Sequence, residues 1–329
     1  DNPDGGWQFI SSPLLGAEVA AAATKVDNAY QPADYDMYKY NGSLENEWVN
    51  HKNGEGINLD FEAYFTEGLG YMYSHQARTI VTLGGELNPA TTNTWELTYT
   101  EDKELANLHL LGNPFTFNMD WSEVTVENVY NGYATLNAEG DNYVYFTEGT
   151  IPVGDGFFVQ AIGSEPGSEP EMSYGMRGSR EKSSNINVIA RGNAGEDNVI
   201  INFAGEGEGF RKLQGFNEDN ARIFVENEGR RYGIANVEAN ATEVELSFVA
   251  AQMGNYTISL DVNGKFETVV LVDRFTGVET NMLLEDEYSF TATSNDSPNR
   301  FVVRLGGAKT ESASFVYQSG DELIIDAEG

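Results

Sequence analysis

The chain contains one short sequence pattern twice, and this duplication constrains its fold more than any other feature. In each copy, a run of alternating apolar residues meets two small or polar residues, then a proline, then an apolar residue. The two copies are Gly6-Trp7-Gln8-Phe9-Ile10-Ser11-Ser12-Pro13-Leu14 and Asn107-Leu108-His109-Leu110-Leu111-Gly112-Asn113-Pro114-Phe115.

A second pair of similar stretches follows the first. Gly68-Leu69-Gly70-Tyr71-Met72-Tyr73 matches Gly154-Asp155-Gly156-Phe157-Phe158-Val159, and Tyr-Phe-Thr-Glu-Gly precedes each match, at 64–68 and 145–149. Because the loops between the two pairs differ in length, these are diverged units rather than tandem repeats of fixed period. We therefore expect two β-rich half-domains that pack on each other.

The composition favours β-structure along the whole chain. Val, Ile, Thr, Tyr and Phe cluster in short stretches that are separated by turns, and the chain contains 35 glycines. Such a composition is typical of strands and tight turns. We predict an all-β fold with two antiparallel β-sandwich-like regions, the first of which holds the internal pseudo-repeat. The alanine-rich stretch from Val19 to Thr24 is the best candidate for a short helix.

Four segments follow from the distribution of strands and turns. Residues 1–165 form the β-rich region with pseudo-duplicated halves, and residues 184–306 form a β-sandwich of jelly-roll or immunoglobulin-like type. Between them, residues 166–183 are rich in Gly, Pro, Ser and Glu, which predicts a linker or loop. Residues 307–329 form a linker and the start of a C-terminal tail, which the resemblance described below identifies as a sorting tail.

The charge and the absence of cysteine exclude several classes of function. The chain has 52 acidic and 19 basic residues, so its net charge is −33. This field repels phosphates and anionic lipid surfaces, so we expect no nucleic-acid partner. No apolar stretch is long enough to span a bilayer, which predicts no membrane insertion. Without cysteine there are no disulfides, thiolate nucleophiles or zinc–thiolate sites.

The polar residues show no catalytic pattern. His51, His75 and His109 are far apart in the sequence and never at metal-ligand spacing, and no Gly-x-Ser-x-Gly elbow occurs. A glycoside hydrolase would need two carboxylates across a cleft. The candidates for such a pair are Asp34, Asp36, Glu62 and Glu67, but their spacing does not distinguish any of them. We expect no enzymatic activity and no catalytic residue.

Calcium is the only metal that the acidic loops leave open. Glu101-Asp102 with Glu104, and Asn217-Glu218-Asp219-Asn220, are compact and rich in oxygen ligands. Neither follows the spacing of an EF-hand loop, so solvated turns are the better interpretation. We expect no cofactor and no bound metal.

Aromatic residues are the best candidates for a binding surface. Many tyrosines and tryptophans of the first region lie on stretches that alternate, so half of them should face the core. Those left outside form a platform for a sugar or a patch for a protein. The candidate ligand-binding residues are Tyr38, Tyr40, Trp48, Tyr71 and Tyr73.

Several of these stretches resemble those of Bacteroidales adhesins and cell-surface proteins. The resemblance rests on the opening at 6–13, the stretch Tyr35-Asp36-Met37-Tyr38-Lys39-Tyr40-Asn41 followed by Glu47-Trp48, the strand at 68–73 and the return at 110–115. In the second region it rests on 269–280, 288–292 and 300–301. It covers about residues 5 to 305, and the stretch 314–329 looks like the opening strands of a type IX-like C-terminal sorting domain.

The resemblance implies a non-enzymatic adhesin-like protein that is secreted or displayed on the outer cell surface. Its partner would be an extracellular protein or glycan of a host or of neighbouring cells. Two alternatives remain open, namely a carbohydrate-binding module and a purely structural module that presents the rest of a larger surface protein. A glycoside hydrolase accessory domain is a further, less favoured alternative. The sequence does not indicate an oligomeric state.

Overall fold

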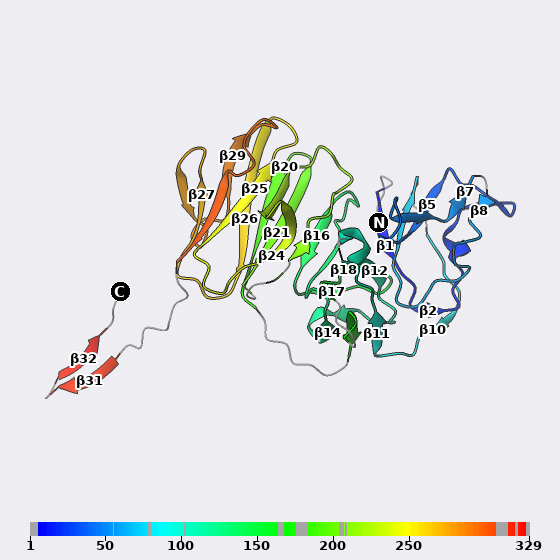
Figure 1. Cartoon of the computed structure of the whole chain (residues 1–329), viewed down its shortest axis with the longest axis horizontal. Helices are drawn as coiled ribbons and strands as arrows, with labels where there is room; N and C mark the ends of the chain where they lie inside the picture. Colours follow the sequence, from blue (N-terminus) through cyan, green and yellow to red (C-terminus); the bar gives the residue numbers. More distant parts are fainter. Residues whose placement is uncertain are drawn as a thin grey trace.

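The computed structural model describes residues 6–54, 56–77, 80–101, 103–163, 168–175, 183–203, 207, 209–306, 315–319 and 322–326. Nearly all regular structure in this part is β-strand, which confirms the predicted all-β fold. Its helical segments are three 3-10 turns, η1 (Val19–Ala22), η2 (Glu104–Asn107) and η3 (Trp121–Glu123). The helix predicted from Val19 to Thr24 is therefore a single short turn. The strands form three bodies in a row (Figure 1).

We call these bodies the first unit (residues 6–87), the second unit (residues 88–175) and the sandwich (residues 183–306). The first unit contains a four-stranded antiparallel sheet in the order β1 (Gln8–Ile10), β9 (Tyr71–His75), β5 (Tyr35–Tyr40) and β6 (Trp48–Asn50). The second unit contains another in the order β12 (Leu108–Gly112), β18 (Gly156–Gln160), β15 (Tyr133–Leu136) and β16 (Tyr143–Phe146). In both sheets the first strand along the chain pairs with the last strand, and the last strand pairs on its other side with the second strand. This shared strand order supports the predicted pseudo-repeat.

Short strand pairs complete the two units. In the first unit these are β2 (Leu14–Leu15) with β10 (Glu86–Leu87), β3 (Lys25–Val26) with β4 (Ala29–Tyr30), and β7 (Lys52–Asn53) with β8 (Gly56–Ile57). In the second unit β13 (Met119–Asp120) pairs with β17 (Thr150–Ile151), and a three-stranded sheet has the order β11 (Asn93–Glu96), β19 (Glu171–Tyr174) and β14 (Val124–Glu127).

Strand β19 differs from the predicted linker at 166–183. It lies between β11 and β14, and its Met172 and Tyr174 side chains are buried in the core of the second unit. The prolines and glycines around this strand hid its alternating apolar residues. Residues 164–167 and 176–182 lie outside the described part of the chain.

The two units meet through the residues that carry the sequence echo. Ser11 donates its backbone N–H to the carbonyl of Gly154 (2.7 Å), and Gly112 donates to the carbonyl of Gly68 (2.9 Å). Ser11 and Gly112 are counterparts in the pattern, as are Gly154 and Gly68. The two hydrogen bonds are thus related by an approximate two-fold axis, which we call the pseudo-dyad.

Bridges between the strands obey the same symmetry. Ile10 pairs with Asp155, and its counterpart Leu111 pairs with Leu69, the counterpart of Asp155. The pentapeptide Tyr-Phe-Thr-Glu-Gly, which occurs in both units, does not obey this symmetry. Tyr145 is buried in β16, whereas Tyr64 lies outside the long strands and is half exposed.

Alternation along β9 and β18 sorts their side chains into separate cores. Met72 and its counterpart Phe158 point to one face, where they share a core between the two units. The residues on either side of Met72 point to the opposite face and belong to the core of the first unit, and those beside Phe158 belong to the core of the second. Each unit therefore has a core of its own and contributes to a common one.

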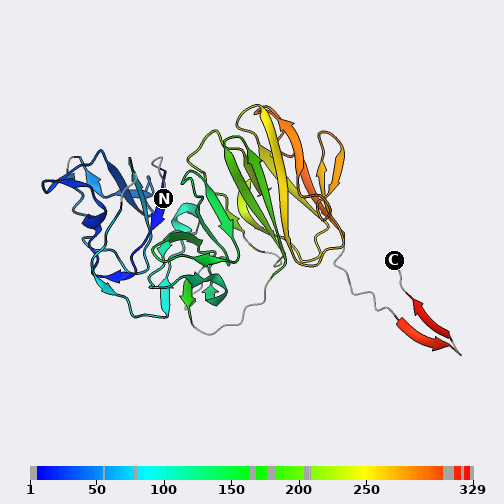
Figure 2. The ribbon, with the colours of Figure 1, turned by 180° about the vertical axis from the view of Figure 1, so that it is seen from behind.

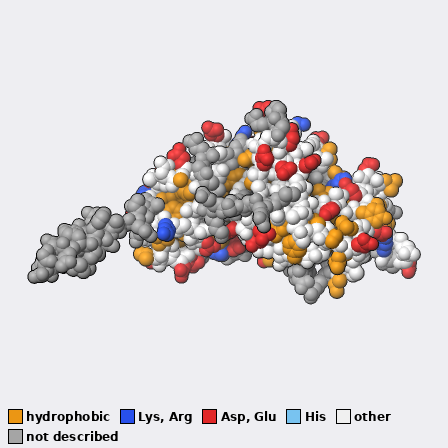
Figure 3. All heavy atoms as spheres, turned by 90° about the horizontal axis from the view of Figure 1, so that it is seen from below, with side chains coloured by type: hydrophobic (Ala, Val, Ile, Leu, Met, Phe, Trp, Pro, Cys, Tyr) orange, Lys and Arg blue, Asp and Glu red, His pale blue; other side chains and the backbone are white. Residues whose placement is uncertain are grey.

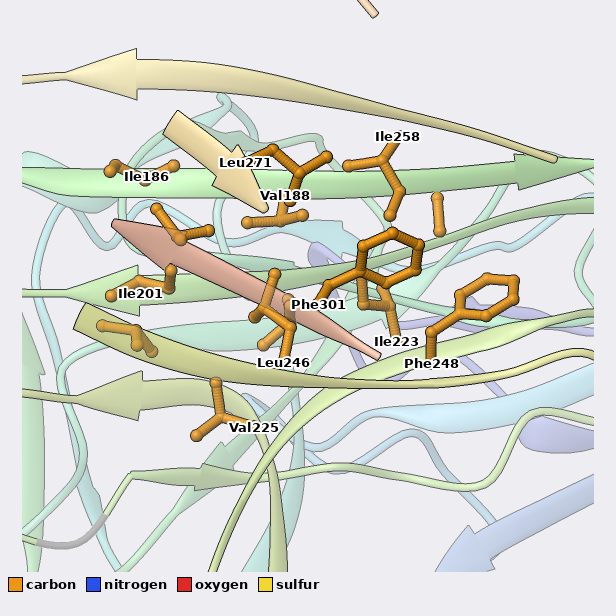
Figure 4. Close-up of a cluster of buried hydrophobic side chains, with 14 of the residues drawn as sticks. Ile186, Val188, Ile201, Ile223, Val225, Leu246, Phe248, Ile258, Leu271 and Phe301 are labelled. Atoms are coloured by element: carbon orange, nitrogen blue, oxygen red, sulfur yellow. The ribbon is translucent and has the colours of Figure 1, made fainter. Parts of the chain in front are cut away.

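The sandwich is a continuous ribbon of strands that folds over a single core (Figure 2). Its order is β28 (Val278–Asn281), β27 (Val269–Asp273), β30 (Phe301–Leu305), β25 (Glu243–Val249), β23 (Arg222–Asn227), β24 (Arg230–Asn236), β21 (Gly195–Asn202), β20 (Asn185–Gly192), β26 (Gly254–Asn263) and β29 (Tyr288–Ala292), with β22 (Phe210–Arg211) beside β24. Strands β21 and β24 run parallel. Figure 4 shows Ile186, Val188, Leu246 and Phe301 among the side chains that fill the core.

The sandwich docks on the outer edge of β16. The side-chain amide of Asn198 accepts a hydrogen bond from the backbone N–H of Tyr145 (3.1 Å) and donates one to its carbonyl (3.2 Å). The Tyr145 side chain is buried, and the backbone N–H of Leu213 donates to its hydroxyl. The amide thus takes the place of a neighbouring strand at Tyr145, the point where the sandwich meets this edge.

The last described strands, β31 (Phe315–Ser319) and β32 (Glu322–Asp326), pair in an antiparallel hairpin. This pairing agrees with the strands expected near the end of the chain. Whether the hairpin opens a sorting domain stays a prediction.

The pseudo-dyad leaves no room for a side chain at Gly70. A Cβ atom at Gly70 would collide with the backbone carbonyl of Leu111 and would lie 2.9 Å from Cγ of Leu110. Overpacking of this kind costs about 1–3 kcal/mol. We expect Gly70→Ala to lower the free energy of unfolding by that amount in a denaturant titration.

Gly84→Ala is the matched control, because a Cβ atom there has open space around it. It should change the free energy of unfolding by less than about 0.5 kcal/mol. Equal effects of the two substitutions would contradict the close contact at the pseudo-dyad.

Asp155 places a carboxyl group where the first unit has Leu69. Burial raises the pKa of this carboxyl to about 6, whereas it lies near 3.9 in an unfolded chain. Folding therefore favours the protonated form, and its contribution to stability is fully present below about pH 4 and is lost as the pH rises through about 6.

We expect Asp155→Asn to raise the free energy of unfolding at pH 7.5 by about 1 kcal/mol, allowing for solvent screening of this partly exposed group. At pH 4 the gain should vanish. The measurement is chemical unfolding at both pH values, with the exposed Asp286→Asn as control. A gain that is the same at both pH values would contradict the assignment.

Candidate functional site

Two of the predicted ligand-binding residues lie in the interior. Tyr71 and Tyr73 are buried in the core of the first unit. The Tyr71 hydroxyl accepts a hydrogen bond from the backbone N–H of Thr66 (3.1 Å), and the Tyr73 hydroxyl donates one to the carbonyl of Ala22 (3.0 Å). Their prediction as surface residues was wrong, because they point to the opposite face of the sheet from Tyr38.

The other three predicted residues lie together on the face that bears Met72. Tyr38, Tyr40 and Trp48 are partly exposed and pack against the common core. Their rings meet edge to face, with centroids 6.4 Å apart for Tyr38 and Trp48 and 5.0 Å apart for Tyr40 and Trp48. Trp7 extends this row, with its ring centroid 5.8 Å from that of Tyr38.

A groove of about 520 Å³ opens at the end of this aromatic row. It is lined by Trp7 just before β1, by Ala33-Asp34-Tyr35-Asp36 where β5 begins, and by Ser74-His75-Gln76 where β9 ends. Because β5 and β9 are antiparallel neighbours, the start of one and the end of the other meet at the same edge of the sheet. An aromatic wall with convergent polar groups is typical of a binding site.

Asp34 and Asp36 give the groove its negative charge. The Asp36 carboxylate forms an ion pair with Lys52 Nζ (2.6 Å), and burial together with this carboxylate raises the pKa of the Tyr38 hydroxyl. Among the residues that the structure describes, no hydrogen bond or ion pair reaches the Asp34 side chain. Asp34 is therefore the acid that a ligand can engage without displacing a partner.

His75 and Gln76 are held by the protein on the other side of the groove. His75 Nε2 lies 2.7 Å from Thr24 Oγ1, and its Nδ1 contacts the backbone of Ala77. The Gln76 side chain donates to the carbonyl of Ala33. These contacts fix the shape of the groove before any ligand arrives.

The sequence did not identify Trp7, Ser74 or Gln76 as site residues. Asp34 and Asp36 were considered only as a hydrolytic pair. The available signal was the alternation itself, since Trp7, Tyr38 and Met72 share one face once the strands are in register. The register joins segments that are far apart in sequence, so alternation within one segment did not reveal it.

The remaining predicted acids serve the structure. Glu62 pairs with Lys39 (2.6 Å), and Glu67 accepts a hydrogen bond from Asn88 (2.7 Å). In the oxygen-rich loops, Glu104 pairs with Arg211 and Arg230, and Asn217 donates to Asp141 (2.9 Å). Asp102 lies outside the described residues. Within the described chain, no three His, Asp or Glu side chains are placed to hold a metal ion.

The other two histidines are packed. Burial lowers the pKa of both His51 and His109. His51 Nδ1 lies 3.2 Å from the Tyr35 hydroxyl, and His109 Nε2 lies 2.9 Å from the carbonyl of Thr98. Both rings therefore have partners within the protein.

No protein-family model, curated protein or solved structure matches this chain. Across the described residues, no helix has the length and apolar character needed to cross a membrane. The groove of the first unit is thus the feature from which a function must be inferred.

Proposed function

We propose that this protein is a non-enzymatic, adhesin-like binding protein that acts outside the cell or on its outer surface. The observation that carries the proposal is the groove with one aromatic wall and two carboxylates. Its residues lie at or beside the ends of three strands of one sheet, so the groove is largely pre-formed. A rigid β-scaffold with a shaped surface needs no catalytic group in order to bind.

The surface charge supports a role in contact with other molecules. Acidic side chains are spread over the face shown in Figure 3, and basic ones are few. Such a surface favours solubility and repels anionic partners, while it attracts cationic ones.

Carbohydrate binding is the second candidate, and the partly exposed row of aromatic rings favours it. The Trp7 ring, which packs against Tyr38, lines the groove together with hydrogen-bonding groups of Asp34 and Gln76. A ring face with polar neighbours suits a sugar, which has one apolar face and a rim of hydroxyls. A glycan array probed with the wild-type protein and with Trp7→Ala tests this candidate.

The test of the main proposal is binding of fluorescently labelled protein to host cells and to neighbouring bacterial cells, measured by flow cytometry. We expect Trp7→Ala and Asp34→Lys each to lower binding at least about tenfold, because each removes a contact worth about 1.4 kcal/mol or more. Thermal unfolding of both variants confirms that they are folded.

Leu59→Ala is the matched control, since Leu59 is 94 % exposed on the same unit and lies outside the groove. It should bind cells like the wild type. If the wild type and both groove variants bound cells to the same extent, the groove would not be the binding site. Binding to no cell and no glycan would favour the purely structural alternative.

A further inference from the structure

The groove has a counterpart in the second unit, defined by matching hydrogen bonds at the strand ends. Gln76 donates its backbone N–H to the carbonyl of Asp34 (2.9 Å), and Ile162 donates in the same way to the carbonyl of Asn128 (2.9 Å). Gln76 and Ile162 both lie six residues after the counterpart glycines Gly70 and Gly156. Asp34 therefore corresponds to Asn128.

The facing residues follow from the strand pairing. Ser74 lies opposite Asp36 in the first sheet. Its counterpart Gln160 accepts a hydrogen bond at its carbonyl from the backbone N–H of Tyr130 (2.7 Å). Asp36 therefore corresponds to Tyr130. The position of Trp7 in the sequence pattern is taken by Leu108, which is buried.

The sandwich covers this counterpart surface with strand β22. The Gln160 side chain donates to the carbonyl of Gly209 (3.3 Å) and accepts from the backbone N–H of Arg211 (2.9 Å). Between these bonds the Phe210 ring is fully buried, with its centroid 6.1 Å from that of Tyr130. A short extended segment thus docks here through backbone hydrogen bonds to one side-chain amide and through one buried ring.

The docked segment carries two basic residues, of which Arg211 faces the second unit and Lys212 pairs with Asp197 of the sandwich (2.7 Å). It reads Gly209-Phe210-Arg211-Lys212-Leu213. Arg211 forms an ion pair with Glu104 of the second unit, and Arg230 of the adjacent strand lies 3.1 Å from the same carboxylate. The contact between sandwich and second unit therefore combines hydrogen bonds from the Gln160 side chain to the backbone of β22 with an ion pair of opposite charges.

On the first unit the corresponding surface is open and more acidic. Asp36 and Asp34 replace Tyr130 and Asn128, and the Trp7 ring is partly exposed where Leu108 is covered. Carboxylates beside an indole ring suit a lysine or arginine side chain, whose stem packs on the ring and whose charge meets the acids. The net charge of −33 draws such a segment in.

We propose that the groove of the first unit is a docking site for an extended, basic segment of a partner protein. The inference rests on the proposed function, in that it takes the groove as the place where a partner binds. It adds the class of partner. This class follows from the segment 209–213, which already occupies the surface of the second unit that the pseudo-dyad relates to the groove.

The experiment uses the whole protein and a capped, fluorescein-labelled peptide with the sequence Gly-Phe-Arg-Lys-Leu-Gln of residues 209–214. Fluorescence anisotropy measures its binding. We expect the peptide to bind the wild type, and a peptide with both basic residues replaced by Gln to bind about tenfold more weakly, since charge-assisted contacts are lost. Added salt should weaken the basic peptide more than the neutral one.

Three variants locate the site. Asp34→Asn should weaken peptide binding about fivefold or more, because it removes the carboxylate at the groove. Glu267→Gln makes the same change of charge at an exposed position of the sandwich and should leave binding unchanged. Gln160→Ala should also leave peptide binding unchanged. A change in this variant would mean that the peptide binds the second unit in place of β22.

Equal binding of the two peptides would overturn the inference, and so would equal effects of Asp34→Asn and Glu267→Gln. Competition by a glycan that binds the groove would also overturn it. A dimer in sedimentation that depends on Asp34 would do the same, because a second copy of the chain would then be the occupant. Loss of cell binding in Trp7→Ala without peptide binding would leave the proposed function intact and reject this inference alone. Peptide binding without cell binding would reject the proposed function and leave this inference intact.

Discussion

Two reciprocal backbone hydrogen bonds hold the first and second units together. The bond from Ser11 to Gly154 and the bond from Gly112 to Gly68 join the two units at the pseudo-dyad. Glycines line this contact because the strands approach too closely for side chains. Each unit can then bury one face of its sheet in its own core and the other in the core that both share.

The sandwich breaks this symmetry. It covers the strand ends of the second unit with strand β22, and its Asn198 hydrogen-bonds the edge of β16 at Tyr145. At the corresponding strand ends of the first unit lies the groove, whose lining is acidic and aromatic. Our proposal assigns this open surface to a ligand, because the sandwich uses the counterpart surface internally.

The sequence was sufficient for the all-β fold and for the segments that meet at the pseudo-dyad, because alternation and glycine positions are local signals. It misplaced β19, since prolines and glycines beside Met172 looked like a linker. It also mixed two faces of one sheet, taking Tyr71 and Tyr73 together with Tyr38. Register between distant strands decides which face a residue occupies, and so Trp7, Ser74 and Gln76 could not be brought together from the sequence.

Native-state hydrogen exchange of the backbone amides of Ser11 and Gly112 tests the pseudo-dyad most directly. Both amides donate across the contact between the units. We predict that both are protected to the same degree and exchange only when the two units separate. Exchange of either amide at the rate of an exposed loop would contradict the account.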